Sequence, residues 1–280
     1  MNFYSETISL SNSEFTILRD LIHEHLGLFY DQGKREQLAD KLCPLLIENN
    51  FSSFLDFYYL LRYDELSAEP LWARMADVLS VPETYFWREI DQIHALVRAI
   101  VPAYFAANLS RPLRIWSVGC ATGEEPLTIA MALSEAGWLN RGKIEIYAGD
   151  FSRANLAKAQ KGLYRERSFR SLPAELKERY FTLRDNQWQV DQALHSRIRW
   201  LQMNLRSEQT AGIPPEFSVI FCRNVFIYFS ETGIRDAVDI FFNRLATPGH
   251  LFVGAAESLL KVTNRLELQE ICGAFVYVKH

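Results

Sequence analysis

The sequence of 280 residues predicts an α/β fold, in which a doubly wound, Rossmann-like sheet carries an antiparallel insertion and follows a small all-α N-terminal domain. Three observations predict this fold. Apolar residues recur at helical spacing through the first 108 residues, strand-like and helix-like patterns alternate from Leu113 onward, and a strand, a glycine turn and a helix follow one another across 113–137.

Residues 1–108 are predicted to form a helical N-terminal domain with a linker. A capping box from Ser11 to Glu14 starts the first helix, and Leu26-Gly27 ends it. Further helices are predicted at 33–49, from 52 or 53 to about 61, at 70–79 and at 90–107. An irregular, aromatic-rich stretch separates the last two, and 108–112 is expected to connect this domain to the next.

Residues 109–280 are predicted to form a second domain around the sheet. Strands are expected at 113–118, 143–149, 197–203, 216–221 and 250–254, with a C-terminal pair at about 264–270 and 274–279. The main helices are expected at 125–137, 153–161 and 231–246. Residues 171–200 interrupt this alternation, and we interpret them as a small antiparallel subdomain on the sheet edge.

The glycine turn after the first strand carries the strongest functional signal. Gly119 ends the strand and Gly123 precedes the helix, so the backbone can turn sharply and approach a ligand closely. Two acids, Glu124 and Glu125, open the helix, and Pro126 suits its first turn. A helix N-terminus usually attracts phosphate, whereas these carboxylates repel a pyrophosphate and favour a cationic ligand.

Asp150 ends the second strand, at the same edge of the sheet as the glycine turn. Its carboxylate can accept hydrogen bonds from ribose hydroxyls. A nucleoside without phosphates but with a cationic group describes S-adenosylmethionine, which we therefore predict as the cofactor, with Gly119, Glu125 and Asp150 in its site. The alternative is that the glycines and Asp150 only shape the fold.

Other polar residues follow aromatic or apolar runs. Arg88 comes after three aromatics, and its guanidinium can bind a carboxylate in a cleft between the domains; a solvated arginine beside packing aromatics is the alternative. Arg223, Asn224 and Tyr228 follow the fourth strand, and an aromatic ring near a sulfonium contributes roughly 0.5–2 kcal/mol. Asn204 follows the third strand, where its amide could hydrogen-bond to adenine; the alternative is that it only caps the local backbone.

Composition excludes several classes of protein. The net charge of −4 argues against non-specific binding of nucleic acid. The four cysteines lack C-x-x-C spacing, and no histidine pairs with Cys or Asp at ligand spacing, so no metal site is predicted. Neither a signal peptide nor an apolar run of about 18 residues is apparent, so we expect no membrane insertion. The scattered cysteines suit a reducing cytoplasm, where we expect the protein to act as a monomer.

Five motifs occur in order along the chain: ETYFWRE at 83–89, WSVGCATGEEP at 116–126, GD at 149–150, GLYRERSF at 162–169 and FCRNVFIYF at 221–229. By these motifs the chain, from about residue 12 to residue 278, resembles the CheR-type chemotaxis-receptor methyltransferases. The resemblance implies a methyltransferase domain that transfers the methyl group of S-adenosylmethionine to glutamate side chains on the cytoplasmic helices of methyl-accepting chemotaxis receptors. S-adenosylhomocysteine would be the product.

The resemblance also implies roles for single residues. Thr84 and Arg88 would lie near the methionine end of the cofactor, with Arg88 also facing the substrate carboxylate. Tyr228 would lie close to the reactive methyl group. The residues implied to hold the cofactor are Glu125, Asp150 on the ribose, Asn204 and Leu205 beside adenine, and Arg223 with Asn224.

Three positions depart from the common pattern of that family. Trp87 stands in place of a second phenylalanine, Pro82 in place of an asparagine, and GAAE at 254–257 in place of Gly-His-Ser-Glu. We interpret Glu257 as structural. The predicted second helix mixes acids with its lysines and arginine where the family tends to be basic, so a methyltransferase of a non-flagellar receptor pathway is an alternative.

Two alternatives belong to other functional classes. The chain could sense S-adenosylmethionine without turnover, although Arg88 and Tyr228 are both present. It could instead be an NAD-dependent oxidoreductase, but the paired acids after Gly123 and the missing G-x-G-x-x-G motif argue against that function.

Overall fold

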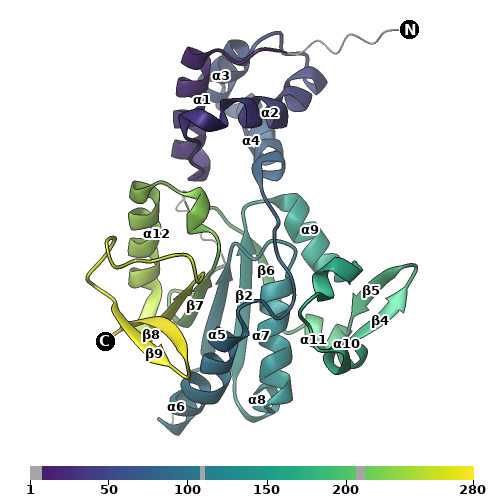
Figure 1. Ribbon diagram of the computed structural model, residues 1–280, viewed down its shortest axis with the longest axis vertical. Coiled ribbons are helices and arrows are strands. Elements are labelled where there is room, and N and C mark those ends of the chain that lie inside the picture. The colour runs from purple at the N-terminus through teal and green to yellow at the C-terminus, as the bar shows by residue number, and fades with distance from the viewer. Residues whose placement is uncertain (1–7, 108–110, 206–211) are drawn as a thin grey trace.

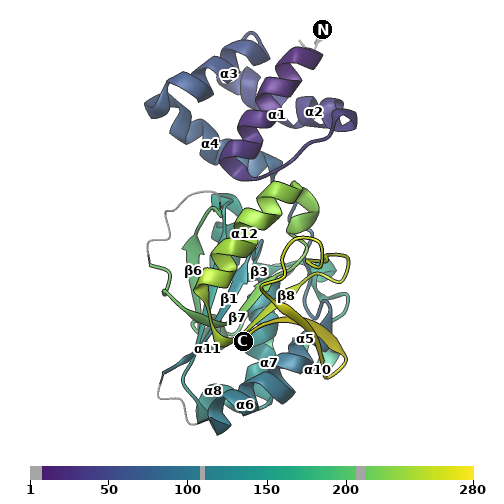
Figure 2. The same cartoon turned by 90° about the vertical axis from the view of Figure 1, so that its left-hand side faces the viewer.

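The computed structural model describes residues 8–107, 111–205 and 212–280 (Figure 1). The connection predicted at 108–112 and the N-terminal stretch, where no signal peptide is apparent, lie partly outside the described residues. A group of helices formed by the N-terminal part of the chain stands at one end of a mixed sheet, and both views show this separation (Figures 1 and 2).

The N-terminal helices are α1 (Asn12–Leu26), α2 (Arg35–Glu48), α3 (Phe54–Tyr63) and α4 (Glu65–Leu79), with a 3-10 turn (η1, Gln32–Lys34) before α2. The predicted capping box is present, because Ser11 Oγ accepts from the N–H of Glu14 while the Glu14 carboxylate accepts from the N–H of Ser11. Gly27, at φ +78°, ends α1. The apolar faces of these helices enclose a core of their own, which contains Phe15 and Phe57.

Helix α4 starts earlier than the sequence suggests. The predicted start at residue 70 is wrong, because Asp64 caps the helix by accepting from the N–H of Ser67 (3.1 Å). Pro70 resembles a first-turn residue, since its missing N–H costs nothing there, but it lies inside α4.

Within the described residues, the main sheet has seven strands in the order β6-β2-β1-β7-β8-β10-β9. The strands are β1 (Leu113–Val118), β2 (Ile144–Asp150), β6 (Ile198–Gln202), β7 (Phe217–Cys222), β8 (Leu245–Val253), β9 (Glu267–Ile271) and β10 (Ala274–Lys279). Neighbours from β6 to β8 pair in parallel, and β10 pairs antiparallel with both β8 and β9. The strand order reverses between β1 and β7, which is where open α/β sheets bind ligands.

Helices cover both faces of this sheet, which confirms the doubly wound fold. The helices involved are α5 (Ile90–Ala95), a π-helical turn (η2, Leu96–Ile100), α6 (Val101–Ala106), α7 (Glu124–Glu135), α8 (Trp138–Arg141), α9 (Arg153–Lys161) and α12 (Glu231–Arg244). Residues of α5, α7 and α9 share one core with the sheet, whereas α12 closes a second core on the opposite face around Trp116 and Phe241.

The antiparallel insertion forms a second small sheet beside α7 and α9 (Figure 1). Its strands, in the order β3-β5-β4, are β3 (Leu163–Tyr164), β5 (Gln187–Val190) and β4 (Phe181–Arg184). It also contains a 3-10 turn (η3, Glu166–Phe169) and the short helices α10 (Ala174–Tyr180) and α11 (Gln192–His195). The strand-like run at 198–201 does not join this insertion but forms β6 of the main sheet.

The N-terminal helices contact the carboxyl edge of the main sheet. Asp77 of α4 accepts hydrogen bonds from Ser152 Oγ (2.6 Å) and from the N–H of Ala154 (3.0 Å), at the start of α9. After α1, the N–H of Phe29 donates to the carbonyl of Tyr228 (2.8 Å). These contacts place the helical domain over the edge where the predicted ligand residues lie.

Candidate active site

The turn between β1 and α7 requires glycine at two positions. Gly119 has φ +66° and Gly123 has φ +95°, in the left-handed region that L side chains rarely adopt. A Cβ atom at Gly119 would lie 2.6 Å from Val225 Cγ2, and one at Gly123 would lie 2.9 Å from Trp200 Cη2. The backbone at Gly119 therefore lies directly against the chain after β7.

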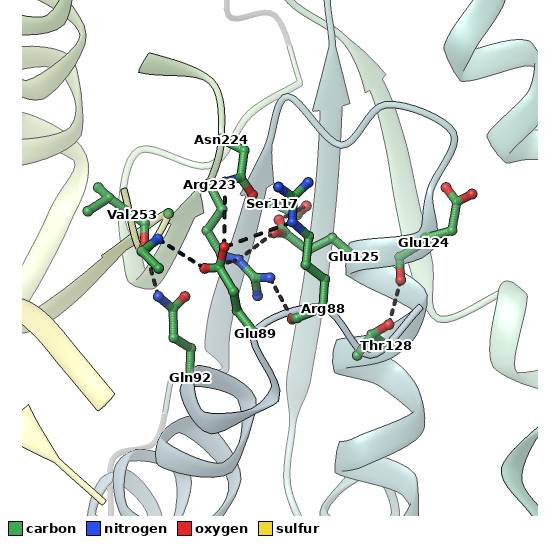
Figure 3. Close-up of polar contacts among 12 residues, drawn as sticks. Arg88, Glu89, Gln92, Ser117, Glu124, Glu125, Thr128, Arg223, Asn224 and Val253 are labelled. Atoms are coloured by element: carbon green, nitrogen blue, oxygen red, sulfur yellow. Dashed lines mark hydrogen bonds and ion pairs between the residues drawn. The ribbon is translucent and has the colours of Figure 1, made fainter. Parts of the chain in front are cut away.

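The two acids at the start of α7 point in different directions (Figure 3). The Glu124 carboxylate accepts hydrogen bonds from Thr122 Oγ1 (2.6 Å) and Ser168 Oγ (3.0 Å), which turns it toward the insertion. The Glu125 carboxylate accepts from Ser117 Oγ (2.6 Å) and lines a polar cavity. The expectation that both acids face a cationic ligand is therefore wrong for Glu124.

Among the described residues, two cavities meet at the carboxyl edge of the sheet and share Val81, Gly119, Ala121 and Asn224 in their walls. The first is polar, and its predicted site residues are Thr84, Arg88, Gly119, Glu125, Arg223 and Asn224. The second is mostly apolar, and its predicted site residues are Gly119, Asp150, Asn204, Leu205, Asn224 and Tyr228. The structure thus brings every site residue predicted from the sequence to one continuous hollow.

Asp150 is almost fully buried at the end of β2. One carboxylate oxygen accepts from the N–H of Ala121 (2.8 Å) and the other from the N–H of Ser152 (2.9 Å). Burial raises the pKa of this carboxyl, and these hydrogen bonds oppose the shift. The Asn155 side chain also donates to this carboxylate. A carboxylate has about four acceptor sites, so Asp150 can still accept from a hydroxyl group in the apolar cavity.

Arg88 projects from a tightly held segment. Phe86 is fully buried against Tyr164, with ring centroids 4.8 Å apart, in an aromatic cluster within the insertion. Trp87 and Glu89, on either side of Arg88, have φ of +69° and +48°, conformations that persist only where the surroundings impose them. Arg88 Nη1 donates to the carbonyl of Glu83 (2.8 Å), so the guanidinium is oriented along the polar cavity.

Arg223 organises the charges of the polar cavity (Figure 3). Its side chain is only 3% exposed, and Nη2 donates to the carbonyl of Arg88 (2.6 Å). Its Nε lies 3.3 Å from Glu125 Oε2 and 3.6 Å from Glu89 Oε2. Burial raises the pKa of the Glu125 carboxyl, and the charge of Arg223 opposes this shift.

The sequence gives little sign of the part that Glu89 plays. Besides Arg223, its carboxylate accepts from the N–H of Ala255 (3.3 Å) and from Asn224 Nδ2 (3.5 Å), so it joins three loops that are distant in sequence. Its place directly after Arg88 in the ETYFWRE motif is the signal that could have pointed to it. Glu257 is structural, as predicted: its carboxylate accepts from the N–H of Asn224 (2.9 Å).

Asn204 and Tyr228 connect the cavity walls to the helical domain. Asn204 Nδ2 donates to the carbonyl of His25 (2.7 Å), in the last turn of α1. The Tyr228 ring packs against the core of the N-terminal helices and lines the apolar cavity. Burial raises the pKa of its hydroxyl, and the charge of Glu83 adds to this shift.

Comparison with known protein families shows to which family the chain belongs. The family profile described as "CheR methyltransferase, SAM binding domain" matches residues 82–273, and the one described as "CheR methyltransferase, all-alpha domain" matches residues 13–80. The chain belongs to the CheR methyltransferase family.

Relatives within the CheR family are similar over nearly their whole length. A chemotaxis protein methyltransferase 2 of Vibrio cholerae is 32% identical over 275 residues, which are 97% of this chain and 94% of the relative. A chemotaxis protein methyltransferase of Borreliella burgdorferi is 30% identical, covering 92% of each chain. One of Escherichia coli is 29% identical, covering 95% of this chain and 91% of the relative.

The hollow fits the cofactor of a CheR methyltransferase, S-adenosylmethionine. Its apolar half is lined by Val118, Met203 and Leu205, which suit a nucleoside base, whereas its polar half offers both carboxylates and guanidinium groups to a charged amino-acid tail. Within the described ranges, no cluster of His, Cys, Asp and Glu is arranged to hold a metal ion. The same residues include no helix long and apolar enough to cross a membrane.

Proposed function

We propose that this protein is a protein-glutamate O-methyltransferase that modifies glutamate side chains on the cytoplasmic helices of methyl-accepting chemotaxis receptors. The observation that carries this proposal is the polar cavity, where Arg88 lies beside Glu125 and Arg223. Such a substrate requires a cation that receives an incoming carboxylate next to a site for a cationic cofactor, and this cavity offers both.

The cofactor-binding roles divide between the two halves of the hollow. Asp150 would accept hydrogen bonds from the ribose hydroxyls, while Asn204 and Leu205 would contact adenine. Glu125 would receive the positively charged amino group of the methionine tail, and Gly119 would let the backbone approach the ligand closely. The remaining residues proposed to contact the tail are Thr84, Arg88, Arg223 and Asn224.

The chemistry needs orientation more than proton transfer. Bound S-adenosylmethionine supplies an electrophilic methyl group on a sulfonium. A glutamate carboxylate is already ionised at neutral pH, so the protein needs no general base. Arg88 would hold the substrate carboxylate in line with the methyl group, and Tyr228 would orient that methyl group. The walls of the cavity would exclude water. Such positioning can lower the reaction barrier by up to roughly 7–11 kcal/mol.

Transfer of a radiolabelled methyl group to purified receptor cytoplasmic fragments tests this proposal. We expect base-labile label on glutamate with the wild type, and a loss of at least about a hundredfold in rate with Arg88→Ala, because the carboxylate is no longer held. Binding of S-adenosylhomocysteine should largely survive in that variant. Binding without transfer by the wild type would instead support a non-catalytic sensor.

The proposed substrate also places the protein in the cell. Because the methylated helices of such receptors lie in the cytoplasm, we propose a cytoplasmic protein that acts on them as a monomer. Sedimentation of the purified protein with and without a receptor fragment checks the monomeric state.

A further inference from the structure

The ring of Tyr85 lies against two guanidinium groups at the polar cavity. Arg170 Cζ is 3.7 Å from the ring centroid and Arg88 Cζ is 5.5 Å from it. Tyr85 itself lines the cavity, whereas Arg170 belongs to the antiparallel insertion and is exposed. A cation from a second structural unit is thus held next to the arginine proposed to receive the substrate.

The segment that carries Arg170 is firmly anchored. The carbonyl of Ser168 accepts from the N–H of Phe86 (2.9 Å), and Ser168 Oγ donates to Glu124 (3.0 Å). Phe169 is buried, with its ring centroid 5.1 Å from that of Phe86. These contacts hold the backbone at Arg170 in place, and the contact with the Tyr85 ring positions its guanidinium.

A guanidinium that stacks on a ring uses its flat face and leaves its N–H edge available. That edge can donate two parallel hydrogen bonds to a carboxylate. No ion pair engages Arg170 among the residues that the structure describes, and Arg165 and Arg167 are exposed on the same segment. Arg170 therefore places a positive charge at the rim of the polar cavity, in a chain whose net charge is −4.

Helix α2 offers no comparable surface. It carries Arg35 and Lys41 against Glu36, Asp40 and Glu48. Lys41 Nζ also donates to the carbonyl of Leu79 (3.4 Å), so it is partly engaged within the domain. Helix α2 therefore presents no net positive charge to an acidic substrate.

We propose that Arg170, stacked on Tyr85, binds a second carboxylate of the substrate, so that the protein prefers glutamates with an acidic neighbour on the same helix face. Residues three or four apart on a helix lie on the same face, with Cβ atoms roughly 5–6 Å apart. Two carboxylates at this spacing can therefore approach the Tyr85 ring, which both guanidinium groups contact. This inference rests on the proposed function and adds a determinant of which glutamate is modified.

The test compares two variants that each remove one exposed arginine. Arg170→Gln removes the rim cation, and Arg141→Gln removes one from α8, which lies at the opposite end of the sheet (Figure 1). The substrate is a receptor cytoplasmic fragment in two forms, with either glutamate or glutamine four residues from the modified glutamate. Initial rates are measured over a range of fragment concentrations and salt concentrations.

We expect Arg170→Gln to raise KM for the acidic form roughly fivefold to tenfold, with kcat changed less than about twofold, because a charge at the rim acts on association. The wild type should prefer the acidic form, and Arg170→Gln should lose both this preference and much of the salt dependence. Arg170→Lys, which keeps the charge but not the planar fork, should recover part of the loss. Arg141→Gln should behave as the wild type.

Equal kinetics for Arg170→Gln and Arg141→Gln would overturn the inference, as would equal rates of the wild type on both fragments. Unchanged binding of S-adenosylhomocysteine shows that each variant is folded. Titration of the fragment without cofactor separates this inference from the proposed function. Binding that depends on Arg170, without any methyl transfer, would contradict the proposed function and support the role of Arg170 in substrate binding.

Discussion

Four charged side chains, Arg88, Glu89, Glu125 and Arg223, form a compact network at the polar cavity. Positive and negative groups alternate in it, and Arg223 is nearly inaccessible to solvent. Removing one partner from a buried pair leaves an uncompensated charge, which costs more than the pair itself contributes. The network therefore fixes Arg88 and Glu125 in place before any ligand arrives.

The neighbouring acids of α7 provide a matched pair of substitutions. Glu125→Gln should weaken binding of S-adenosylmethionine by roughly tenfold or more, because the carboxylate that faces the cationic ligand becomes neutral. Glu124→Gln should leave this affinity within about twofold, since its side chain is turned to Thr122 and Ser168. Isothermal titration measures both, and equal losses in the two variants would contradict the assignment.

The pKa of Glu125 predicts how cofactor affinity depends on pH. Burial raises this pKa above its ordinary value of 4.5, so a fraction of the folded protein stays protonated in mildly acidic solution. The ionised form attracts a cationic ligand, and affinity should therefore increase as pH rises through the raised pKa. Titrations across this range should show the increase in the wild type and a weaker dependence in Glu125→Gln.

The same shift has the opposite effect on stability. The folded chain keeps the Glu125 proton to higher pH than the unfolded chain does, so the free energy of unfolding falls as pH rises from 4.5 through the raised pKa. Urea titrations of the protein without ligand should show this contribution shrink in Glu125→Gln. An unchanged pH dependence of stability in that variant would indicate an ordinary pKa at Glu125.

At the level of single residues, the sequence predicted which residues gather at the site but not all of their directions. Glu124 and Glu125 are adjacent, and which of them faces the cavity depends on the hydroxyl groups that each accepts from, Thr122 and Ser168 for Glu124 and Ser117 for Glu125. The role of Glu89 depends on Ala255 and other groups far along the chain, which a local pattern cannot reveal.

At the level of elements, the parallel strands were predictable because each is an apolar run that ends at a glycine or a polar residue. Strand β8 starts at Leu245, earlier than the predicted residue 250, because Pro248 and Gly249 look like a loop. Leu245 nevertheless pairs with Phe217 of β7, and the pairing resumes at His250 with a shifted register. The start of α4 was mispredicted for a related reason, since Pro70 resembles a helix boundary.

In the strand–turn–helix element, we expect a single added methyl group to lower cofactor affinity strongly. Gly123→Ala should lower cofactor affinity by at least about tenfold, because φ is +95° and the new Cβ would lie 2.9 Å from Trp200. Gly273→Ala, at φ +83° with open space around it, serves as the control for strain alone. Equal cofactor affinity in both variants and the wild type would show that the turn tolerates a side chain.

At the level of the whole molecule, the helical domain forms part of the cofactor cavity. Leu26 and Leu79 belong to that domain, whereas Asp150 and Met203 belong to the sheet domain, and all four line the apolar cavity. Docking of the helices on the sheet edge and binding of the cofactor should therefore be coupled.

Asp77→Ala tests this coupling. The variant loses the acceptor for Ser152 Oγ and for the N–H of Ala154, so α4 should dock less firmly and cofactor affinity should fall roughly threefold to tenfold. Glu69→Ala, which removes an exposed acid from the same helix, should have little effect. Hydrogen exchange of α4 with and without S-adenosylhomocysteine measures the docking, and unchanged protection in Asp77→Ala would exclude this coupling.

The most direct test of cofactor binding in this hollow is a crystal structure of the protein with S-adenosylhomocysteine. We expect adenine in the apolar half beside Leu205, the ribose hydroxyls on Asp150, and the amino-acid tail between Glu125 and Arg88. An empty hollow at saturating ligand, or a dinucleotide whose phosphates lie against Glu125, would contradict it.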